Sequence, residues 1–273
     1  MARFDTVYTH GHHDSVLRSH SVRTAADSAA YLLPHQRSGM DLLDVGSGPG
    51  TITADLADVV GMGAHGGTVT AVENTESAIE LTRATCADRG LDVRCLVADV
   101  HDLGFPAAGF DIVHAHQVLQ HVGDPVQALR EMRRVCRPDG IVAVREADYA
   151  GFTWYPRLPE LDRWLELYRR AARANGGEPD AGRHLSAWAR DAGFTDVTIS
   201  ASTWCFADAD SRAWWGGMWS DRIVHSAIGE QLVAAGWATR TELGDISDAW
   251  QRWAADPDGL LVIPHVELLA RAG

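Results

Sequence analysis

The chain has 273 residues, 46% of them hydrophobic and 22% charged, which is the composition of a globular protein large enough to bury a full core. Its formal net charge of −13 argues against nucleic acid as a partner, because phosphate binding needs clustered cations. All 24 basic residues are arginines, so Schiff-base chemistry at a lysine is excluded. The four cysteines contain no C-x-x-C pair, and the first residues lack the apolar core of a signal peptide. No apolar stretch is long enough to cross a bilayer. These features predict a cytoplasmic protein that contacts no membrane.

Residues 1–38 predict an N-terminal arm followed by a helix. The helix is expected to be capped at residues 14–15 and to end near Leu33. The arm carries Tyr8 and a histidine cluster, which consists of His10, His12 and His13. No acid or cysteine stands at ligand spacing from these histidines, so we expect no metal site. The arm is therefore either solvated or a lid that closes over a binding site.

A glycine-rich turn stands between the first predicted strand, Leu42-Leu43, and a helix that begins at Thr51. The turn has the sequence Asp44-Val45-Gly46-Ser47-Gly48-Pro49-Gly50. Glycines let the backbone approach a ligand closely, and the helix N-terminus adds free N–H groups and a partial positive charge. The arrangement predicts a binding site for a dinucleotide or for S-adenosylmethionine (SAM).

The spacing of the glycines separates these two ligands. The dinucleotide fingerprint is G-x-G-x-x-G, whereas Gly50 comes one residue earlier than the third glycine of that pattern. A carboxylate at Asp44 is unfavourable beside a pyrophosphate but suits a ligand that carries an ammonium and a sulfonium group. The segment resembles motif I of the class I SAM-dependent methyltransferases. A nicotinamide-dependent oxidoreductase is the alternative against which the spacing argues.

Acidic residues end three successive predicted strands, namely Asp44, Glu73 and Asp99. In a parallel sheet those strand ends line one crevice. In this fold the acid after the second strand takes both ribose hydroxyls, and the acid after the third accepts from the adenine amino group. Arg23 is expected to bind the methionyl carboxylate, and the alternative for it is an exposed helical arginine. The expected SAM contacts are Arg23, Asp44, Gly46, Gly48, Glu73, Asn74, Asp99, Val100 and His116.

The run from Phe110 to Gly140 resembles the SAM methyltransferases of the UbiE/Coq5 group, methyltransferase type 11. Their pattern is F-D-x-V, then L-x-H-x-x-D-P, then L-x-E-x-x-R-V-x-x-P-x-G. The matching positions from the second part onward are Leu119, His121, Asp124, Pro125, Leu129, Glu131, Arg134, Val135, Pro138 and Gly140, and Asp139 departs from the usual glycine. The resemblance covers residues 40–150 and implies a SAM-binding core over residues 39–150, with S-adenosylhomocysteine (SAH) as product.

The composition changes after residue 150, because all ten tryptophans lie at or beyond Trp154. Residues 151–273 are expected to form substrate-capping helices and the last strands of the same sheet. The helices are predicted over residues 158–175, 183–192, 210–235 and 240–255, and the strands over residues 193–200 and, antiparallel, 260–269. The fold class is therefore α/β, with a Rossmann-like, seven-stranded, mostly parallel sheet, helices on both faces and a helical cap.

Most of the tryptophans are expected to fill the core and the helix interfaces. Trp214, Trp215 and Trp219 are the candidates for an aromatic substrate pocket. Gly216 and Gly217 lie among them, and a helix does not favour two glycines in its interior. The segment is therefore predicted to be a bend or a loop beside the pocket.

Methyl transfer from SAM is an in-line displacement at an activated carbon, so the protein mainly supplies proximity and orientation. Where the acceptor must lose a proton, His121 is the candidate base, because it follows the fourth strand. Glu146 is expected to orient it, with Asp148 as the alternative. The other interpretation of His121 is a residue that caps or packs under the next helix. Tyr8 and His13 are the second candidates for catalysis, and Tyr8 also for a substrate contact.

Residues 8–25 resemble the arm of actinobacterial natural-product methyltransferases, some of which methylate indole C3 of tryptophan-containing cyclodipeptides with pyrroloindoline formation. The resemblance implies a small aromatic natural product as the substrate. O- or N-methylation of another aromatic metabolite is an alternative. A further alternative is a protein that retains SAM and uses the sulfonium only electrostatically. The sequence leaves open whether the protein is a monomer or a homodimer.

Overall fold

The structure of the protein is a computed structural model, which describes residues 23–61 and 66–273. Tyr8, the histidine cluster and the predicted cap at residues 14–15 lie outside the described residues. In the described part, the expectation of a helix up to Leu33 is wrong. Helix α2 spans only Ala25–Ser28 and is capped by Thr24, whose side chain accepts from the Asp27 amide. A 3-10 turn, η1 (Leu33–His35), follows, where the proline ring at position 34 leaves no amide to continue an α-helix.

The described residues form one sheet of eight strands in the order β3-β2-β1-β4-β5-β8-β6, with β7 also paired to β8. Strands β1 to β5 pair with one another in parallel, and β8 is antiparallel to β5. This confirms the α/β, mostly parallel fold, with one strand more than predicted because the short β6 also pairs with β8. The strands are β1 (Leu42–Val45), β2 (Val69–Glu73), β3 (Arg94–Val97), β4 (Phe110–His116), β5 (Cys136–Ala147), β6 (Thr153–Tyr155), β7 (Val197–Phe206) and β8 (Leu260–Arg271).

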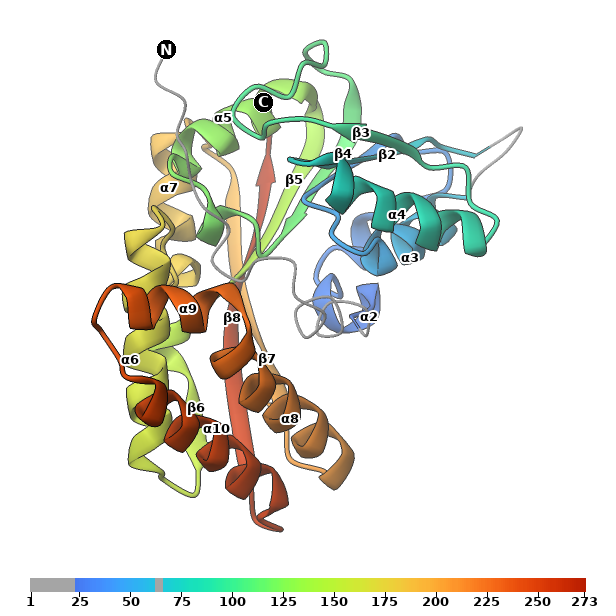
Figure 1. Ribbon diagram of the computed structural model, residues 1–273. Helices are drawn as coiled ribbons and strands as arrows, with labels where there is room; N and C mark the ends of the chain where they lie inside the picture. The colour runs from blue at the N-terminus through green and yellow to red at the C-terminus, as the bar shows by residue number, and fades with distance from the viewer. Residues whose placement is uncertain (1–22, 62–65) are drawn as a thin grey trace.

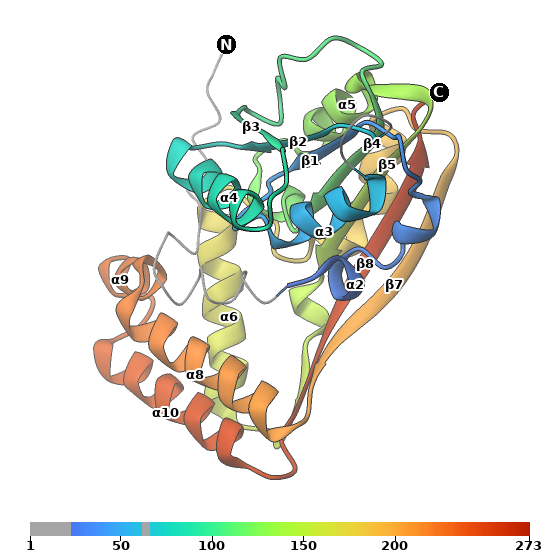
Figure 2. The same cartoon turned by 90° about the vertical axis from the view of Figure 1, so that its right-hand side faces the viewer.

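Both faces of the sheet carry helices (Figures 1 and 2). Successive residues of a strand point to opposite faces, so Leu43 and Val113 pack with α5 and α7, whereas Leu42 and Ile112 pack with α2 and α3. Each central strand is therefore buried on both sides, as its apolar sequence predicts. The helices of the core are α3 (Thr51–Val60), α4 (Glu76–Asp88), α5 (Pro125–Val135) and α7 (Leu185–Asp191), with the 3-10 turns η2 (Leu119–His121), η3 (Tyr149–Gly151) and η4 (Ala181–His184).

A second hydrophobic cluster fills the helical cap. Four tryptophans are fully buried in it, namely Trp164, Trp219, Trp250 and Trp253. Trp164 meets Trp219 and Trp250 edge to face, with ring centroids 4.6 and 4.9 Å apart. The cap stands at one end of the sheet (Figure 1). Its helices are α6 (Pro159–Ala174), α8 (Ala209–His225), α9 (Ala227–Ala234) and α10 (Arg240–Ala255).

Helix α8 corrects the expectation of a bend or loop at residues 214–219, since the helix runs through both glycines. Gly216 is needed for packing: a Cβ there would lie 2.7 Å from the Ala254 Cβ and 2.8 Å from the Trp250 carbonyl oxygen of α10. The long helix predicted over residues 210–235 divides instead at Ser226. This residue is extended, with φ −104° and ψ 172°, and it separates α8 from α9.

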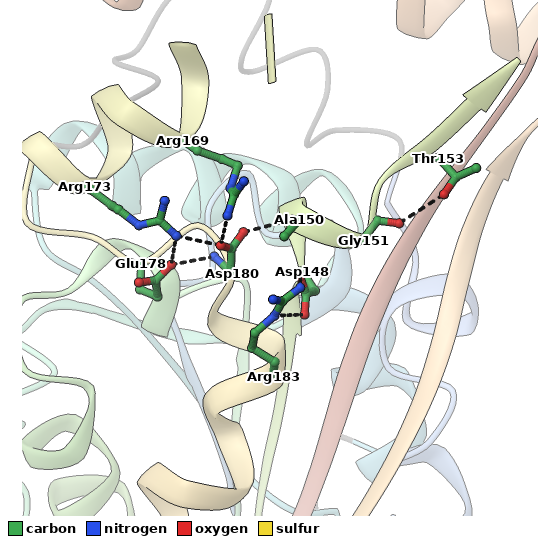
Figure 3. A network of polar contacts seen from close by, with 9 residues as sticks. All are labelled: Asp148, Ala150, Gly151, Thr153, Arg169, Arg173, Glu178, Asp180 and Arg183. Carbon is green, nitrogen blue, oxygen red and sulfur yellow. Dashed lines mark hydrogen bonds and ion pairs between the residues drawn. The ribbon is translucent and has the colours of Figure 1, made fainter. Parts of the chain in front are cut away.

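A network of ion pairs fastens the cap to the end of β5 (Figure 3). The Asp180 carboxylate is 3% exposed and accepts from Arg169 at 2.5 Å, from Arg173 at 2.6 Å and from the Ala150 amide at 2.9 Å. Because several donors converge on one buried acceptor, the network holds α6 against the chain that leaves β5. Among the helices of residues 23–61 and 66–273, none is long and apolar enough to cross a membrane.

Candidate active site

A cavity of about 790 Å³ lies at the carboxyl ends of the parallel strands. Its size is typical of sites for small molecules. One part of its wall is the glycine-rich turn and the residues that follow β2 and β3. The other part is aromatic and comes from the cap and the segment after β5. The predicted site residues that line the cavity are Arg23, Asp44, Gly46, Gly48, Glu73, Asn74, Asp99, Val100, His116, His121, Trp215 and Trp219.

The glycine-rich turn has a backbone that side chains would not permit. Gly46 and Gly50 have φ angles of +71° and +82°. A Cβ on Gly46 would lie 2.4 Å from Val118, and one on Gly50 would lie 2.7 Å from the Cα of Thr82. These contacts close the turn tightly onto the segment after β4 and onto α4, and they leave the main chain of the turn as the cavity wall.

The Asp44 carboxylate ties the floor of the site together. One oxygen is 2.7 Å from the Nδ1 atom of His114 on β4, and the other accepts from the Thr53 hydroxyl of α3 at 2.5 Å. Asp44 is 3% exposed, so these bonds satisfy a buried carboxylate. The residue lines the cavity and at the same time connects β1 to two neighbouring elements.

Glu73 and Asp99 lie at the ends of β2 and β3, as predicted. Glu73 accepts from the Gly48 amide at 2.8 Å and from the Asn74 amide at 3.1 Å, so its carboxylate bridges the turn and the start of the next loop. Asp99 accepts from the main chain and the ring of His101, at 2.9 and 2.7 Å. Both carboxylates line the cavity on the same side as the glycine-rich turn.

Arg23 and His116 meet around Trp204 of β7. Arg23 precedes α2, and its guanidinium carbon lies 5.0 Å from the centroid of the Trp204 ring. The His116 ring centroid is 5.7 Å from that of Trp204. Within the described part of the chain neither ring nitrogen of His116 has a hydrogen-bond partner, although the residue is 7% exposed. Burial, with Arg23 and Arg145 nearby, lowers the pKa of His116, so a bound ligand would meet a neutral ring.

His121 lines the cavity at the end of η2. Its Nε2 atom lies 3.0 Å from the Nε2 atom of the Gln120 side chain. Burial lowers the pKa of His121 to about 4, and the positive charge of Arg23 acts in the same direction. The imidazole is therefore neutral at pH 7. The Gln120 amide nitrogen can only donate, so its NH2 group faces the Nε2 lone pair of His121, and the ring is a weaker base than a solvated histidine.

The expectation that Glu146 orients the ring of His121 directly is wrong, because its hydrogen bonds among the described residues go to the main chain. Glu146 is fully buried, and its carboxylate accepts from the amides of Val118 at 2.9 Å, Leu119 at 2.7 Å and Gln120 at 3.3 Å. Burial raises the pKa of Glu146 to about 8, against these amide hydrogen bonds, which lower it. The Glu146 carboxyl group therefore fixes the main chain from Val118 to Gln120, just before His121.

Asp148, the alternative orienter, is also committed elsewhere. It accepts from two nitrogens of Arg183 at 2.7 and 2.6 Å (Figure 3). The ion pair belongs to the contacts between the end of β5 and η4, where the charge-assisted bonds fix the carboxylate in a bidentate geometry.

The aromatic wall contains two of the three predicted tryptophans. Trp215 and Trp219 line the cavity, whereas Trp214, on the same helix, is not among the lining residues described. The wall also contains residues that the sequence did not single out, and these are Tyr149, Phe152, Trp204, Met218 and Arg222. Their positions depend on how the cap packs on the sheet, and the tryptophan enrichment after residue 150 gave only their general region.

Gln117 and His265 form a further polar contact that the sequence did not predict. The Nε2 atoms of the two side chains lie 2.8 Å apart, although 148 residues separate them. Gln117 lines the cavity directly after β4. Within residues 23–61 and 66–273, no group of three or more His, Cys, Asp or Glu side chains is arranged to hold a metal ion.

Comparison with known proteins places this architecture. The model of a family described as "Methyltransferase domain" matches residues 36–192. An uncharacterized methyltransferase of Schizosaccharomyces pombe is 35% identical over 257 residues, which cover 92% of this chain and 91% of the relative. A ubiquinone/menaquinone biosynthesis C-methyltransferase, UbiE, of Bdellovibrio bacteriovorus is 36% identical over 110 residues, 40% of this chain and 45% of the relative.

A solved structure from Bacillus halodurans, of a candidate methyltransferase, has the same fold. Its TM-score is 0.57, and the match covers 89% of this chain and 97% of that one. The sequence identity is 18%, so this likeness concerns the fold alone.

Proposed function

The chain belongs to the methyltransferase domain family and is a SAM-dependent methyltransferase, as residues 40–150 predicted, and from this premise we propose that it methylates a small aromatic natural product. One observation carries the proposal: the glycine-rich turn and the aromatic wall line a single cavity. The cofactor and an aromatic acceptor would thus share one cavity, where reacting atoms can be aligned.

The residues around the glycine-rich turn fit SAM. The turn leaves main chain as the cavity wall, and a Cβ at Gly46 would collide with Val118. We propose that Glu73 binds the ribose hydroxyls, with Asn74 beside it, and that Asp99 and the Val100 amide bind adenine. Arg23 and His116, whose ring nitrogens have no hydrogen-bond partner among residues 23–61 and 66–273, line the cavity beyond the turn, where the methionyl end would lie. SAM supplies a methyl group already activated by a positive sulfur.

The protein's own contribution is orientation and exclusion of water. The cap seals the aromatic wall with fully buried tryptophans, so the acceptor would be held in a largely apolar space. Glu146 fixes the main chain from Val118 to Gln120 and thereby the position of His121. We propose His121 as the acceptor of the proton that the substrate releases, since its ring is neutral and lines the cavity.

For the substrate we propose indole C3 of a tryptophan-containing cyclodipeptide. Flat, electron-rich rings stack well on the rings of Trp215 and Trp219. As the bond between indole C3 and the methyl carbon forms, the bond from that carbon to sulfur breaks. The diketopiperazine nitrogen then closes onto indole C2 to give the pyrroloindoline, and the proton of that nitrogen leaves for a base.

The test uses the purified protein, SAM with a deuterated methyl group and cyclo(L-Trp-L-Trp), with products analysed by mass spectrometry and NMR. We expect a product one labelled methyl group heavier, with the label on C3. Label on nitrogen or oxygen of an aromatic acceptor would support the alternative methyl transfer and refute the C3 assignment. Mass spectrometry of ligand carried through purification checks the cofactor, since a bound nicotinamide nucleotide instead of SAM or SAH would contradict the proposal.

Two neighbouring tryptophans give a matched pair for the aromatic wall. Trp215 lines the cavity and Trp214 does not, yet both lie on α8. We expect Trp215→Leu to raise the KM of the aromatic acceptor about 3- to 10-fold, from the loss of ring stacking, and Trp214→Leu to leave it nearly unchanged. Equal effects of the two substitutions, at equal melting temperature, would contradict an acceptor bound at this wall.

A further inference from the structure

Gln117 has a backbone conformation that is uncommon for its residue type. Its φ is +55°, in the left-handed region that favours glycine. The conformation is held by a hydrogen bond from the Gln117 amide to the Arg145 carbonyl at 2.8 Å. Strained residues of this kind cluster at functional sites, where the side chain is needed in one place. Gln117 lines the cavity, so its side chain is a candidate for such a role.

His265 determines which end of the Gln117 amide is available. The Nδ1 atom of His265 lies 3.1 Å from the Ile263 carbonyl oxygen, which can only accept, so this nitrogen carries the proton. Burial and the nearby charges of Arg145 and Arg23 lower the pKa of His265, so the ring is neutral. The Nε2 atom of His265 therefore carries a lone pair, and it accepts a hydrogen bond from the NH2 group of Gln117 at 2.8 Å.

The Gln117 carbonyl oxygen is left as an acceptor. The NH2 group of Gln117 faces His265, because a flipped amide would place the Gln117 oxygen against the Nε2 lone pair of His265. None of the hydrogen bonds among the described residues occupies the Gln117 Oε1 atom, and the residue stands in the cavity wall. The preceding residue, His116, brings both of its ring nitrogens to the same wall without a protein partner in the described chain. Both observations indicate that a polar ligand group binds at the end of β4.

Resting on the proposed methyl transfer, we propose that Gln117 is the residue that positions the methyl acceptor, by accepting a hydrogen bond at Oε1 from an N–H or O–H group of its aromatic ring system. His265 is a positioning residue that acts through Gln117. The acceptor class is then an aromatic compound with a free N–H or O–H. An indole N–H bonded to Oε1 would fix the plane of the ring and so the direction of C3.

The experiment measures binding to the SAH complex by fluorine NMR, with 5-fluoroindole and 5-fluorobenzothiophene as probes. The two rings have nearly the same shape, and only the first donates a hydrogen bond. We expect the wild type to prefer 5-fluoroindole, and Gln117→Asn to reduce this preference about 3- to 10-fold, which is the contribution of one hydrogen bond. Asparagine keeps the amide and suits positive φ, but it is one methylene too short, so this variant is expected to fold.

His265→Leu tests the relay. We expect it to reduce the same preference by a similar factor, and the double variant to lose little more, because both act on one hydrogen bond. A wild type without preference for 5-fluoroindole, without measurable binding of it, or a preference that survives Gln117→Asn would overturn the inference. Those results would not contradict the proposed methyl transfer, whereas a wild type that binds no SAH would contradict the proposed function itself.

Discussion

Glu73 offers the sharpest test of how the cofactor is held. Its carboxylate has one oxygen 2.8 Å from the Gly48 amide and the other 3.1 Å from the Asn74 amide. Glu73→Ala therefore does two things: it removes the charged acceptor proposed for the ribose, and it releases the amide of the glycine-rich turn. We expect the first loss to cost about 1.5–3 kcal/mol of SAH binding and the second about 1 kcal/mol.

These energies translate into affinities that calorimetry resolves easily. The two losses together raise the Kd for SAH about 70- to 900-fold. Glu73→Gln separates them, because the amide oxygen can still accept from Gly48 while the NH2 group now faces the Asn74 amide. We expect this variant to lie between the wild type and Glu73→Ala, with a Kd raised about 10-fold.

The assay is titration calorimetry with SAH, with melting temperature as the check on folding. Glu76→Gln is the matched control, because Glu76 lies three residues further on, is 69% exposed and pairs with Arg83 at the surface. It should leave the Kd unchanged. A folded Glu73→Ala protein with a Kd within about threefold of the wild type would refute the placement of the ribose, since a hydrogen bond to a charged group typically contributes about 1.5–3 kcal/mol.

Three further predictions concern catalysis and stability. His121→Asn is expected to lower kcat about 10²-fold, the low end for a base. Wild-type kcat is expected to be flat near neutral pH and to fall as the pH drops toward 4, where the imidazole takes a proton. Release of SAH measures both, and an unchanged kcat in the variant would leave a site that works by orientation alone. Asp180→Asn should lower the free energy of unfolding by about 1–3 kcal/mol, or the melting temperature by about 2–10 °C. The control, Asp162→Asn at the surface, should change the free energy of unfolding by less than about 0.5 kcal/mol. Equal losses of stability in the two variants would contradict a structural role of the Asp180 network. Gly216→Ala should destabilise the cap, because the new Cβ would collide with α10. Gly217→Ala, with open space around the new Cβ, should stabilise the protein by about 0.5–1 kcal/mol. Calorimetric unfolding in which both variants change the stability in the same direction would refute the packing argument.

The sequence predicted the cofactor side of the cavity because that side is built from local features. A glycine-rich turn between a strand and a helix fixes the path of the main chain. An acidic side chain at the end of a parallel strand can occupy only a few positions, all near the same edge of the sheet. Asp44, Glu73 and Asp99 accordingly line one cavity. Glu146 was misassigned for a related reason: its position at the strand end was predicted, but its partners are three main-chain amides, which no residue pattern marks.

The acceptor side depends on contacts between distant segments. The helix through Gly216 and Gly217 is stabilised by its packing on α10, which outweighs the low helix propensity of glycine. Trp204 reaches the cavity because β7 pairs with β8 over the whole length of β7. The contact of Gln117 with His265 arises because β8 runs antiparallel beside β5, so residues far apart in the chain meet at one strand end.

The protonation state of the buried histidines links this geometry to the chemistry. Burial lowers the pKa values of His116, His121 and His265, and the charge of Arg23 lowers each of them further. A cavity that receives a sulfonium cation would be penalised by imidazolium groups in its wall, because like charges repel strongly where water is excluded. Neutral rings avoid that cost, and among residues 23–61 and 66–273 both ring nitrogens of His116 remain without a hydrogen-bond partner. The charge of Arg23 therefore acts in the same direction as burial, and both favour the neutral form of the three histidines.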